Sequence, residues 1–256
     1  MGVFFLDLEF VNGNFYLADI FEIALLSYNS KHLFHNYIKL HQPLPRYVQK
    51  LTHLNDEFLI ENGTSFKKTM SNFIAFLQHE QTLDPTPLVI VAHGGFFSDF
   101  PILLSNCFKY NFKNINILKE CTFIDSMFTF KNAGWVQPGL DALCKENNLS
   151  RSGHSAVNDV YLLKTVFSKF PELSSYRYSF LEILLFTNEK MPLSFQTIIT
   201  MARESKSILE LKAKLIQNSK RKSALNHMQA EKISTYFFER RMLFHFLYTI
   251  GIQKKV

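Results

Sequence analysis

The sequence predicts a mixed α/β fold, with a sheet flanked by helices, followed by a C-terminal α-helical extension. Short runs of strand-forming residues come first, and strands then alternate with amphipathic helices up to about residue 170. Beyond Pro171 the pattern is helical. The chain has 256 residues, of which 47% are hydrophobic and 20% charged. This composition supports a packed core and excludes general disorder.

The first predicted elements are three strands that form an antiparallel start to the sheet. A turn at Asn12-Gly13-Asn14 separates the first apolar run from a second, β-rich segment, so these two are expected to pair as a hairpin. Two prolines, Pro43 and Pro45, then break the chain after the third strand. The three strands are expected over residues 3–8, 20–28 and 35–40.

Helices and strands are then expected in turn. Residues 66–79 place apolar side chains at helical spacing, which predicts an amphipathic helix. Residues 88–92 (LVIVA) are fully apolar, as is typical of a strand at the centre of a sheet. Residues 122–124 are expected to form an edge strand that ends at Asp125. Further helices are predicted over residues 99–110, 140–147 and 157–170.

Charge divides the chain at the predicted boundary. The net charge is +6, yet residues 172–256 alone hold 14 Lys+Arg against 7 Asp+Glu. Residues 1–171 are expected to form one domain, and residues 172–256 a basic extension with helices over about 178–187, 193–219 and 225–250. A concentration of positive charge indicates an acidic partner such as nucleic acid, although a solvated helical surface explains it equally well.

The extension leaves three interpretations open. It is expected to be a packed helical appendage, a track for the DNA backbone, or a surface for a protein partner or a second copy of the chain. The apolar face is made by Ile208, Leu211, Leu215 and Met228. The basic residues of a DNA track would be Lys206, Lys212, Lys214, Lys220, Arg221, Lys222, Arg240 and Arg241.

Cysteine usage and the N-terminus indicate an intracellular protein, nuclear or cytoplasmic and not secreted. The three cysteines are odd in number and have no metal-ligand spacing, so a reducing compartment fits best. The N-terminal stretch MGVFFLDLEF carries two acids and no basic lead, unlike a signal peptide. No apolar run reaches the ~20 residues of a membrane span.

Five polar residues form the candidate site. Asp7 and Glu9 stand two apart on the first strand, so both carboxylates lie on one face, where a divalent cation would offset their repulsion. Asp99 follows the apolar strand 88–92, beyond whose carboxyl end ligands often bind. His154 and Asp159 stand at the start of a late helix. Each motif alone is weak, but their ordered combination is specific.

In this combination the sequence resembles the DEDDh 3′→5′ exonucleases, which have a ribonuclease-H-like fold. The motifs FFLDLEF, AHGGFFSDFPIL and HSAVNDV are similar to those of the three-prime repair exonuclease branch and of the related domain in promyelocytic-leukaemia-protein relatives. The segments DIFEIALLS, FIDSM and GLDALCKENNL also resemble family segments. The resemblance covers about residues 2–170 and leaves out residues 172–256.

The resemblance implies two-metal hydrolysis of phosphodiester bonds at DNA 3′ ends, single- or double-stranded. Two Mg²⁺ ions, which Mn²⁺ could replace, would be held by Asp7, Glu9, Asp99 and Asp159. His154 would be the general base. Separately from the resemblance, Leu8, Phe10 and Phe15 are candidate substrate contacts; the two phenylalanines would stack on the terminal base or would instead belong to the core.

The sequence departs from the family pattern at two places. The Thr and Gly that usually follow the first motif are absent, since Phe10, Val11 and Asn12 follow Glu9, so an exonuclease acting on RNA stays open. Gly94 replaces the usual Asn after His93, and His93 is interpreted as structural. The alternative from another class is a catalytically silent nucleic-acid-binding or scaffold protein. The presence of all five site residues favours an enzyme.

Overall fold

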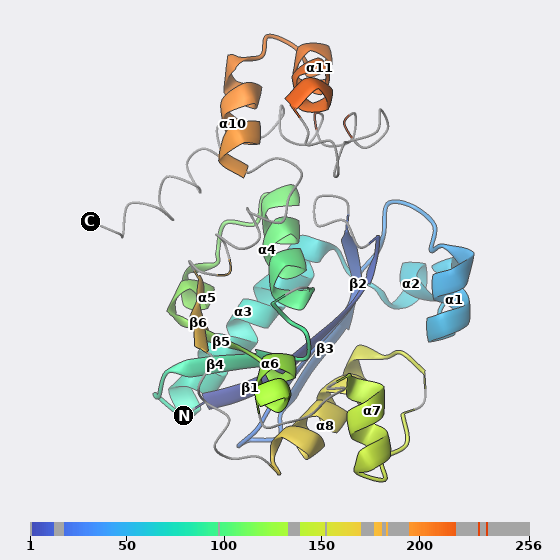
Figure 1. Ribbon diagram of the computed structural model, residues 1–256, viewed down its shortest axis with the longest axis vertical. Helices are drawn as coiled ribbons and strands as arrows, with labels where there is room; N and C mark the ends of the chain where they lie inside the picture. The colour runs from blue at the N-terminus through green and yellow to red at the C-terminus, as the bar shows by residue number, and fades with distance from the viewer. Residues whose placement is uncertain are drawn as a thin grey trace.

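The computed structural model describes residues 2–12, 18–96, 98–132, 139–151, 153–169, 177–180 and 195–218, with single residues at 183, 230 and 234. These segments form a mixed α/β structure around one six-stranded sheet, with helices on both faces (Figure 1). The predicted α/β fold class is therefore confirmed. No helix among the described residues is long and apolar enough to cross a membrane.

The sheet has the strand order β3-β2-β1-β4-β5-β6. Strands β1, β4 and β5 run parallel, whereas β2 and β3 on one side and β6 on the other are antiparallel to their neighbours. The predicted hairpin of the first two strands is present as β1 paired with β2. The strands are β1 (Gly2–Val11), β2 (Asp19–Ser27), β3 (Leu33–Tyr37), β4 (Leu88–Ala92), β5 (Thr122–Asp125) and β6 (Arg177–Ser179).

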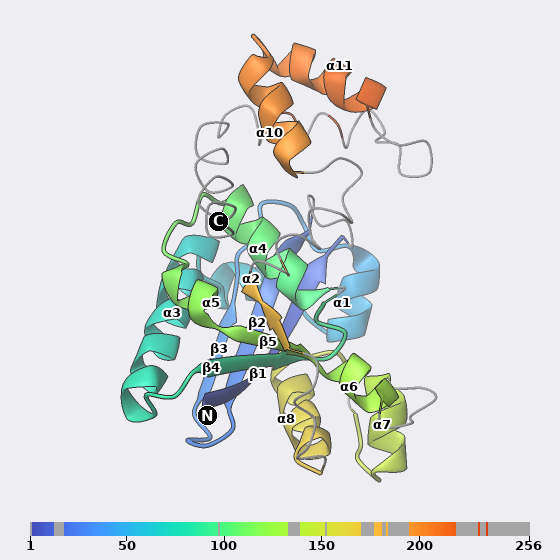
Figure 2. The ribbon, with the colours of Figure 1, turned by 60° about the vertical axis from the view of Figure 1, so that its left-hand side comes forward.

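Alternation along β1 assigns its side chains to two different helical layers. Phe4, Leu6 and Leu8 belong to the larger core cluster, which includes side chains of α3 (Phe66–Leu83) and α4 (Asp99–Lys109). Phe5 faces the other way, into the cluster formed with α8 (Ala156–Phe167). In Figure 2, α8 and α7 (Leu140–Glu146) lie together beneath β1, away from α3. Residues two and four positions after Phe5 therefore face α8.

Two of the helices begin at side-chain caps. Asn55 accepts a hydrogen bond from the backbone N–H of Phe58 at the start of α2 (Asp56–Asn62), and Ser65 accepts one from Lys68 at the start of α3. The sequence pattern did not predict α2, nor three other short helices. These are α1 (Arg46–Thr52), α5 (Asn116–Glu120) and α6 (Ser126–Asn132).

The structure corrects three predictions in the second half of the chain. β5 is not an edge strand, because β6 pairs with it on the side away from β4. Residues 177–179 form that strand, so the helix expected from about residue 178 starts after it, and the described residues Phe180 and Ile183 within its expected range are helical. The single helix expected over 193–219 is two helices, α10 (Phe195–Glu204) and α11 (Ile208–Asn218), separated by Ser205-Lys206-Ser207.

The C-terminal extension is described only in part. Leu211 and Leu215 of the expected apolar face are buried, whereas Met228 lies outside the described residues. The same holds for most of the helix expected over 225–250. The division at residue 171 stays a prediction, although β6 lies beyond it and belongs to the sheet.

Candidate active site

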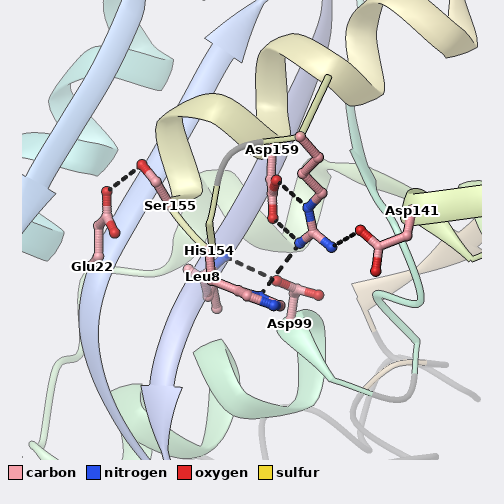
Figure 3. Close-up of polar contacts among 8 residues, drawn as sticks. Leu8, Glu22, Asp99, Asp141, His154, Ser155 and Asp159 are labelled. Carbon is pink, nitrogen blue, oxygen red and sulfur yellow. Dashed lines mark hydrogen bonds and ion pairs between the residues drawn. The ribbon is translucent and has the colours of Figure 1, made fainter. Parts of the chain in front are cut away.

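The five predicted site residues come together near β1, at the start of α4 and at the start of α8. Asp7 and Glu9 lie on β1, on the face that meets α8. Asp99 is the first residue of α4, His154 lies just before α8, and Asp159 is in its first turn. Residues more than 150 positions apart in the chain thus form one acidic site, of which Figure 3 shows Asp99, His154 and Asp159.

Asp99 is fixed to β1 by hydrogen bonds to both of its oxygens. The backbone N–H of Leu8 donates to Oδ1 at 3.0 Å, and the Ser98 hydroxyl donates to Oδ2 at 2.7 Å. Burial raises the pKa of Asp99 to about 6, and these hydrogen bonds oppose that rise. The start of α4 is therefore held directly beside the strand that carries Asp7 and Glu9.

A metal-ligating donor set converges at the centre of the site. Glu9, His154 and Asp159 each offer one ligand atom, and the three atoms lie within 4.8 Å of one another. Burial, followed by the charges of Glu22 and Asp159, raises the pKa of Glu9 to about 8. Carboxylates whose ionised form is this disfavoured are stabilised by a cation, so the residues fit a divalent metal ion.

Asp7 is half-buried on β1 and is not part of the 4.8 Å group. Burial and then the charge of Asp99 raise the pKa of Asp7 well above its ordinary value, and Asp159 and Glu9 add to the rise. These effects show that the four carboxylates act on one another electrostatically. The carboxylates of Asp7 and Asp99 thus lie outside the 4.8 Å group, but they interact electrostatically with its members.

Arg151 is a residue of the site that sequence reasoning missed. Its guanidinium pairs with both oxygens of Asp159, at 2.9 Å from Nε to Oδ1 and through a second contact from NH2 to Oδ2. It also pairs with Asp141 of α7 at 2.7 Å, and NH2 lies 3.4 Å from Nδ1 of His154. The available signal was a basic residue three positions before His154, which no motif marked out.

Glu22 of β2 is a second residue of the site that no sequence motif marks. It lies directly opposite Glu9 in the β1–β2 register and is 1% exposed. His35 Nε2 lies 3.0 Å from its Oε1, and the Ser155 hydroxyl donates to the same oxygen at 3.4 Å. Figure 3 shows Ser155 beside Glu22, on the chain segment that carries His154. Glu22 therefore connects the central strands to the start of α8.

The turn between β4 and α4 is organised by Asp125, at the end of β5. Its carboxylate accepts hydrogen bonds from the backbone N–H groups of Gly94, Phe96 and Met127, at 2.9, 3.0 and 2.9 Å. Gly94 has a φ of 70°, a conformation open to Gly and, less readily, to Asn. An Asn at this position could therefore adopt the conformation that Gly94 has here.

The predicted substrate contacts have different surroundings. Leu8 has a buried side chain in the core, and Phe10 packs partly buried against that core. Phe15 lies outside the described residues. Their contacts with substrate remain proposals. His93 places Nδ1 at 2.9 Å from the Ser126 hydroxyl, a contact between the ends of β4 and β5.

Comparisons with known proteins bear on the fold. No family model matches the chain, and no curated protein matches it. Among solved structures, the chain is similar to the nuclease domain of 3'hExo, a DEDDh family member, bound to rAMP. The TM-score is 0.54 and the identity 14%, over 68% of this chain and 92% of that one. The mixed sheet flanked by helices thus has a ribonuclease-H-like fold, as predicted.

Proposed function

We propose that this chain is a metal-dependent 3′→5′ exonuclease of the DEDDh type that removes nucleotides from DNA 3′ ends. The observation that carries the proposal is the convergence of Glu9, His154 and Asp159 within 4.8 Å, beside the carboxylates of Asp7 and Asp99. A purely structural site has no need for four neighbouring carboxylates in which the charges of Asp99 and Asp159 raise the pKa of Asp7 and of Glu9. The ribonuclease-H-like fold shared with a nuclease domain supports the same proposal.

Asp7, Glu9, Asp99 and Asp159 would hold the metal, and their hard oxygen atoms favour two Mg²⁺ ions, or Mn²⁺ in their place. When bound, such ions activate a water molecule and neutralise charge on the phosphate and the leaving oxygen. In the structure, Leu8 and Ser98 orient Asp99 by donating to its two oxygens. The same hydrogen bonds keep its carboxylate turned toward β1.

His154 would accept the proton of the attacking water through a ring nitrogen. The side chain lies at the end of the loop before α8, and its neighbour Ser155 donates to Glu22. The leaving 3′ oxygen takes up a proton, so the products are a nucleoside 5′-monophosphate and a chain shorter by one nucleotide. Placement of the base on a loop lets it reach substrate while Asp159 stays on the helix.

RNA is the second candidate substrate. The 3'hExo nuclease domain was solved with rAMP, a ribonucleotide. The sequence also lacks the family's Thr and Gly after Glu9, where a ribose 2′-hydroxyl would have to fit. Whether the substrate is DNA or RNA, the proposed partner is nucleic acid, and the proposed activity requires no membrane. The basic extension would add backbone contacts, a protein interface or a homodimer contact.

The test uses 5′-labelled single- and double-stranded DNA, and matching RNA, with the metal-free full chain. Addition of Mg²⁺ is expected to give a ladder that shortens from the 3′ end, and EDTA to abolish it. His154→Ala and Asp159→Asn should each lose the ladder, whereas His79→Ala, on the exposed face of α3, should retain it. Absence of cleavage on every substrate with Mg²⁺ and Mn²⁺ would favour the silent binding protein.

A further inference from the structure

Arg151 occupies the lone pairs of Asp159 that a metal ion would use. Its Nε and Nη2 groups pair with the two oxygens of Asp159, and both contacts are among the dashed lines at Asp159 in Figure 3. A guanidinium paired in this way satisfies both oxygens of a carboxylate and leaves little freedom for another cation. Metal binding at Asp159 and the present pairing therefore compete for the same atoms.

The pairing is largely withdrawn from water. The Asp159 side chain is 4% exposed and the Arg151 side chain 15%. An ion pair in this environment is screened far less than a surface pair, and breaking it leaves a buried charge. In the absence of metal, Arg151 is thus a counter-ion for an acidic cluster that would otherwise be uncompensated.

Arg151 has a second ion-pair partner, Asp141, which can hold it when it leaves Asp159. Its NH1 group, which Asp159 does not use, donates to Asp141 Oδ1 at 2.7 Å. Asp141 is 80% exposed and lies in the first turn of α7, a different helix from that of Asp159. The long Arg side chain can rotate about its link to Asp141, which keeps one ion pair while it gives up the other.

We propose that Arg151 is a displaceable counter-ion of the metal site. It holds Asp159 while the site lacks metal, and it moves toward Asp141 when a divalent cation binds. The proposal rests on the proposed function, because it takes Asp159 to be a metal ligand. It makes Arg151 a residue that sets how tightly the metal is bound.

A purely structural role for Arg151 predicts an effect of the opposite sign. If Arg151 only held Asp159 in place for the metal, its removal would misplace a ligand and weaken metal binding. If it competes with the metal, its removal strengthens binding and at the same time destabilises the metal-free protein. The direction of the change in affinity therefore separates the two roles.

The test is calorimetric titration of Mn²⁺ into the metal-free full chain. Arg151→Gln is expected to bind Mn²⁺ about tenfold more tightly than the wild type, since a desolvated charge-assisted contact no longer opposes it. Lys67→Gln, an equal loss of charge on the exposed surface of α3, should match the wild type. Equal or weaker binding by Arg151→Gln would overturn the proposal.

Asp141→Asn gives the reciprocal result. Without its second partner, Arg151 should stay on Asp159, so Mn²⁺ binding should weaken several-fold. Glu146→Gln, a loss of one negative charge on the same helix, controls for charge alone and should show little change. If Asp141→Asn and Glu146→Gln bind Mn²⁺ with the same affinity, the proposed exchange of Arg151 between Asp159 and Asp141 is wrong.

Thermal unfolding supplies a readout that does not depend on activity. Arg151→Gln should lower the Tm of the metal-free protein. Saturating Mn²⁺ should then raise the Tm of Arg151→Gln by more than it raises the Tm of the wild type.

Should Arg151→Gln not fold, Arg151→Lys keeps the charge without the two-pronged contact and should still bind Mn²⁺ more tightly than the wild type. If that variant binds Mn²⁺ equally or less tightly, the proposal is overturned. A wild type that binds no Mn²⁺ would instead contradict the proposed function and leave Arg151 as a fixed structural partner.

Discussion

Two glutamates face each other across the β1–β2 pair. Glu9 and Glu22 are direct partners in the register, and Glu22 is the strongest charged neighbour that raises the pKa of Glu9. Like charges directly opposite in a sheet are destabilising. His35 offsets part of the cost by pairing with Glu22. At the residue scale, the site holds unfavourable charge that a bound cation would relieve.

Stability of the metal-free protein should therefore fall with rising pH. The pKa values of Asp99, about 6, and Glu9, about 8, lie above the ordinary values of 3.8 and 4.5. At these two groups the folded chain thus holds more protons than the unfolded chain in this window, and their contribution to stability is full below pH 4 and is lost as the pH rises to about 8. Urea unfolding in EDTA measures this. Glu9→Gln should flatten the decline, and a flat wild-type profile would contradict the account.

Glu22→Gln should lower the pKa of Glu9 toward its ordinary value. The substitution removes the largest charge contribution to that shift, while burial remains. Carboxyl NMR titration of the metal-free protein measures the change. Glu80→Gln alters another buried glutamate, one paired with His32 and Ser30, and should leave the pKa of Glu9 unchanged. A Glu9 pKa that stays near 8 in Glu22→Gln would show that burial alone sets it.

At the scale of elements, the turn from β4 into α4 decides where Asp99 lies. Asp125 binds the N–H groups of Gly94 and Phe96, and the N–H of Phe100 donates to the Gly95 carbonyl at 2.9 Å. A Cβ atom on Gly95 would lie 2.6 Å from that of Ala92, so a side chain does not fit there. The turn is thus held from β5 and closed by a glycine.

Asp125→Asn should destabilise the protein by about 1–3 kcal/mol. The amide keeps one acceptor oxygen and turns an NH₂ group toward one of the backbone N–H groups, which stays buried without its partner. Chemical denaturation in EDTA measures the loss independently of any metal. A stability equal to that of the wild type would mean that the turn holds without this carboxylate.

At the scale of the whole molecule, the sheet does not end at residue 171. β6 pairs with β5, and Phe180 and Ile183 belong to the main core cluster. Leu211 and Leu215 of α11 belong to that cluster as well. The chain beyond residue 171 therefore contributes to the packing of the fold, whatever it binds.

Truncation after residue 171 should therefore lower the Tm more than truncation after residue 183. The shorter chain loses β6 and two core side chains, whereas the longer chain keeps them. Both lose the same helices, α10 and α11, so the comparison isolates the edge of the sheet. Equal melting temperatures would show that β6 is dispensable.

Regular patterns predicted much of this fold, and non-local contacts account for most of what was missed. The apolar run at 88–92 identified β4 because a strand at the centre of a sheet is buried on both faces. β6 has three residues, two of them exposed, and depends on pairing with β5, which leaves no pattern in the sequence. Local signals for α2 were present in its Asn55 cap and its two acids in the first turn.

The site was predictable where motifs carry it. Asp7, Glu9, Asp99, His154 and Asp159 were named from the sequence, and the structure gathers them. Arg151 and Glu22 were not, because their importance lies in what they touch. An isolated Arg in a loop and a Glu in a strand carry no periodicity, and only the register and the fold place them against Asp159 and Glu9.

The central claim is that this site cuts terminal nucleotides. The most direct measurement is release of the 3′-terminal nucleotide from end-labelled DNA, with the product identified by mass. With Mg²⁺ the wild type should release nucleoside 5′-monophosphates, and His154→Ala should be slower by at least about 100-fold. Equal release by the wild type and the variant, or none with either Mg²⁺ or Mn²⁺, would contradict the account.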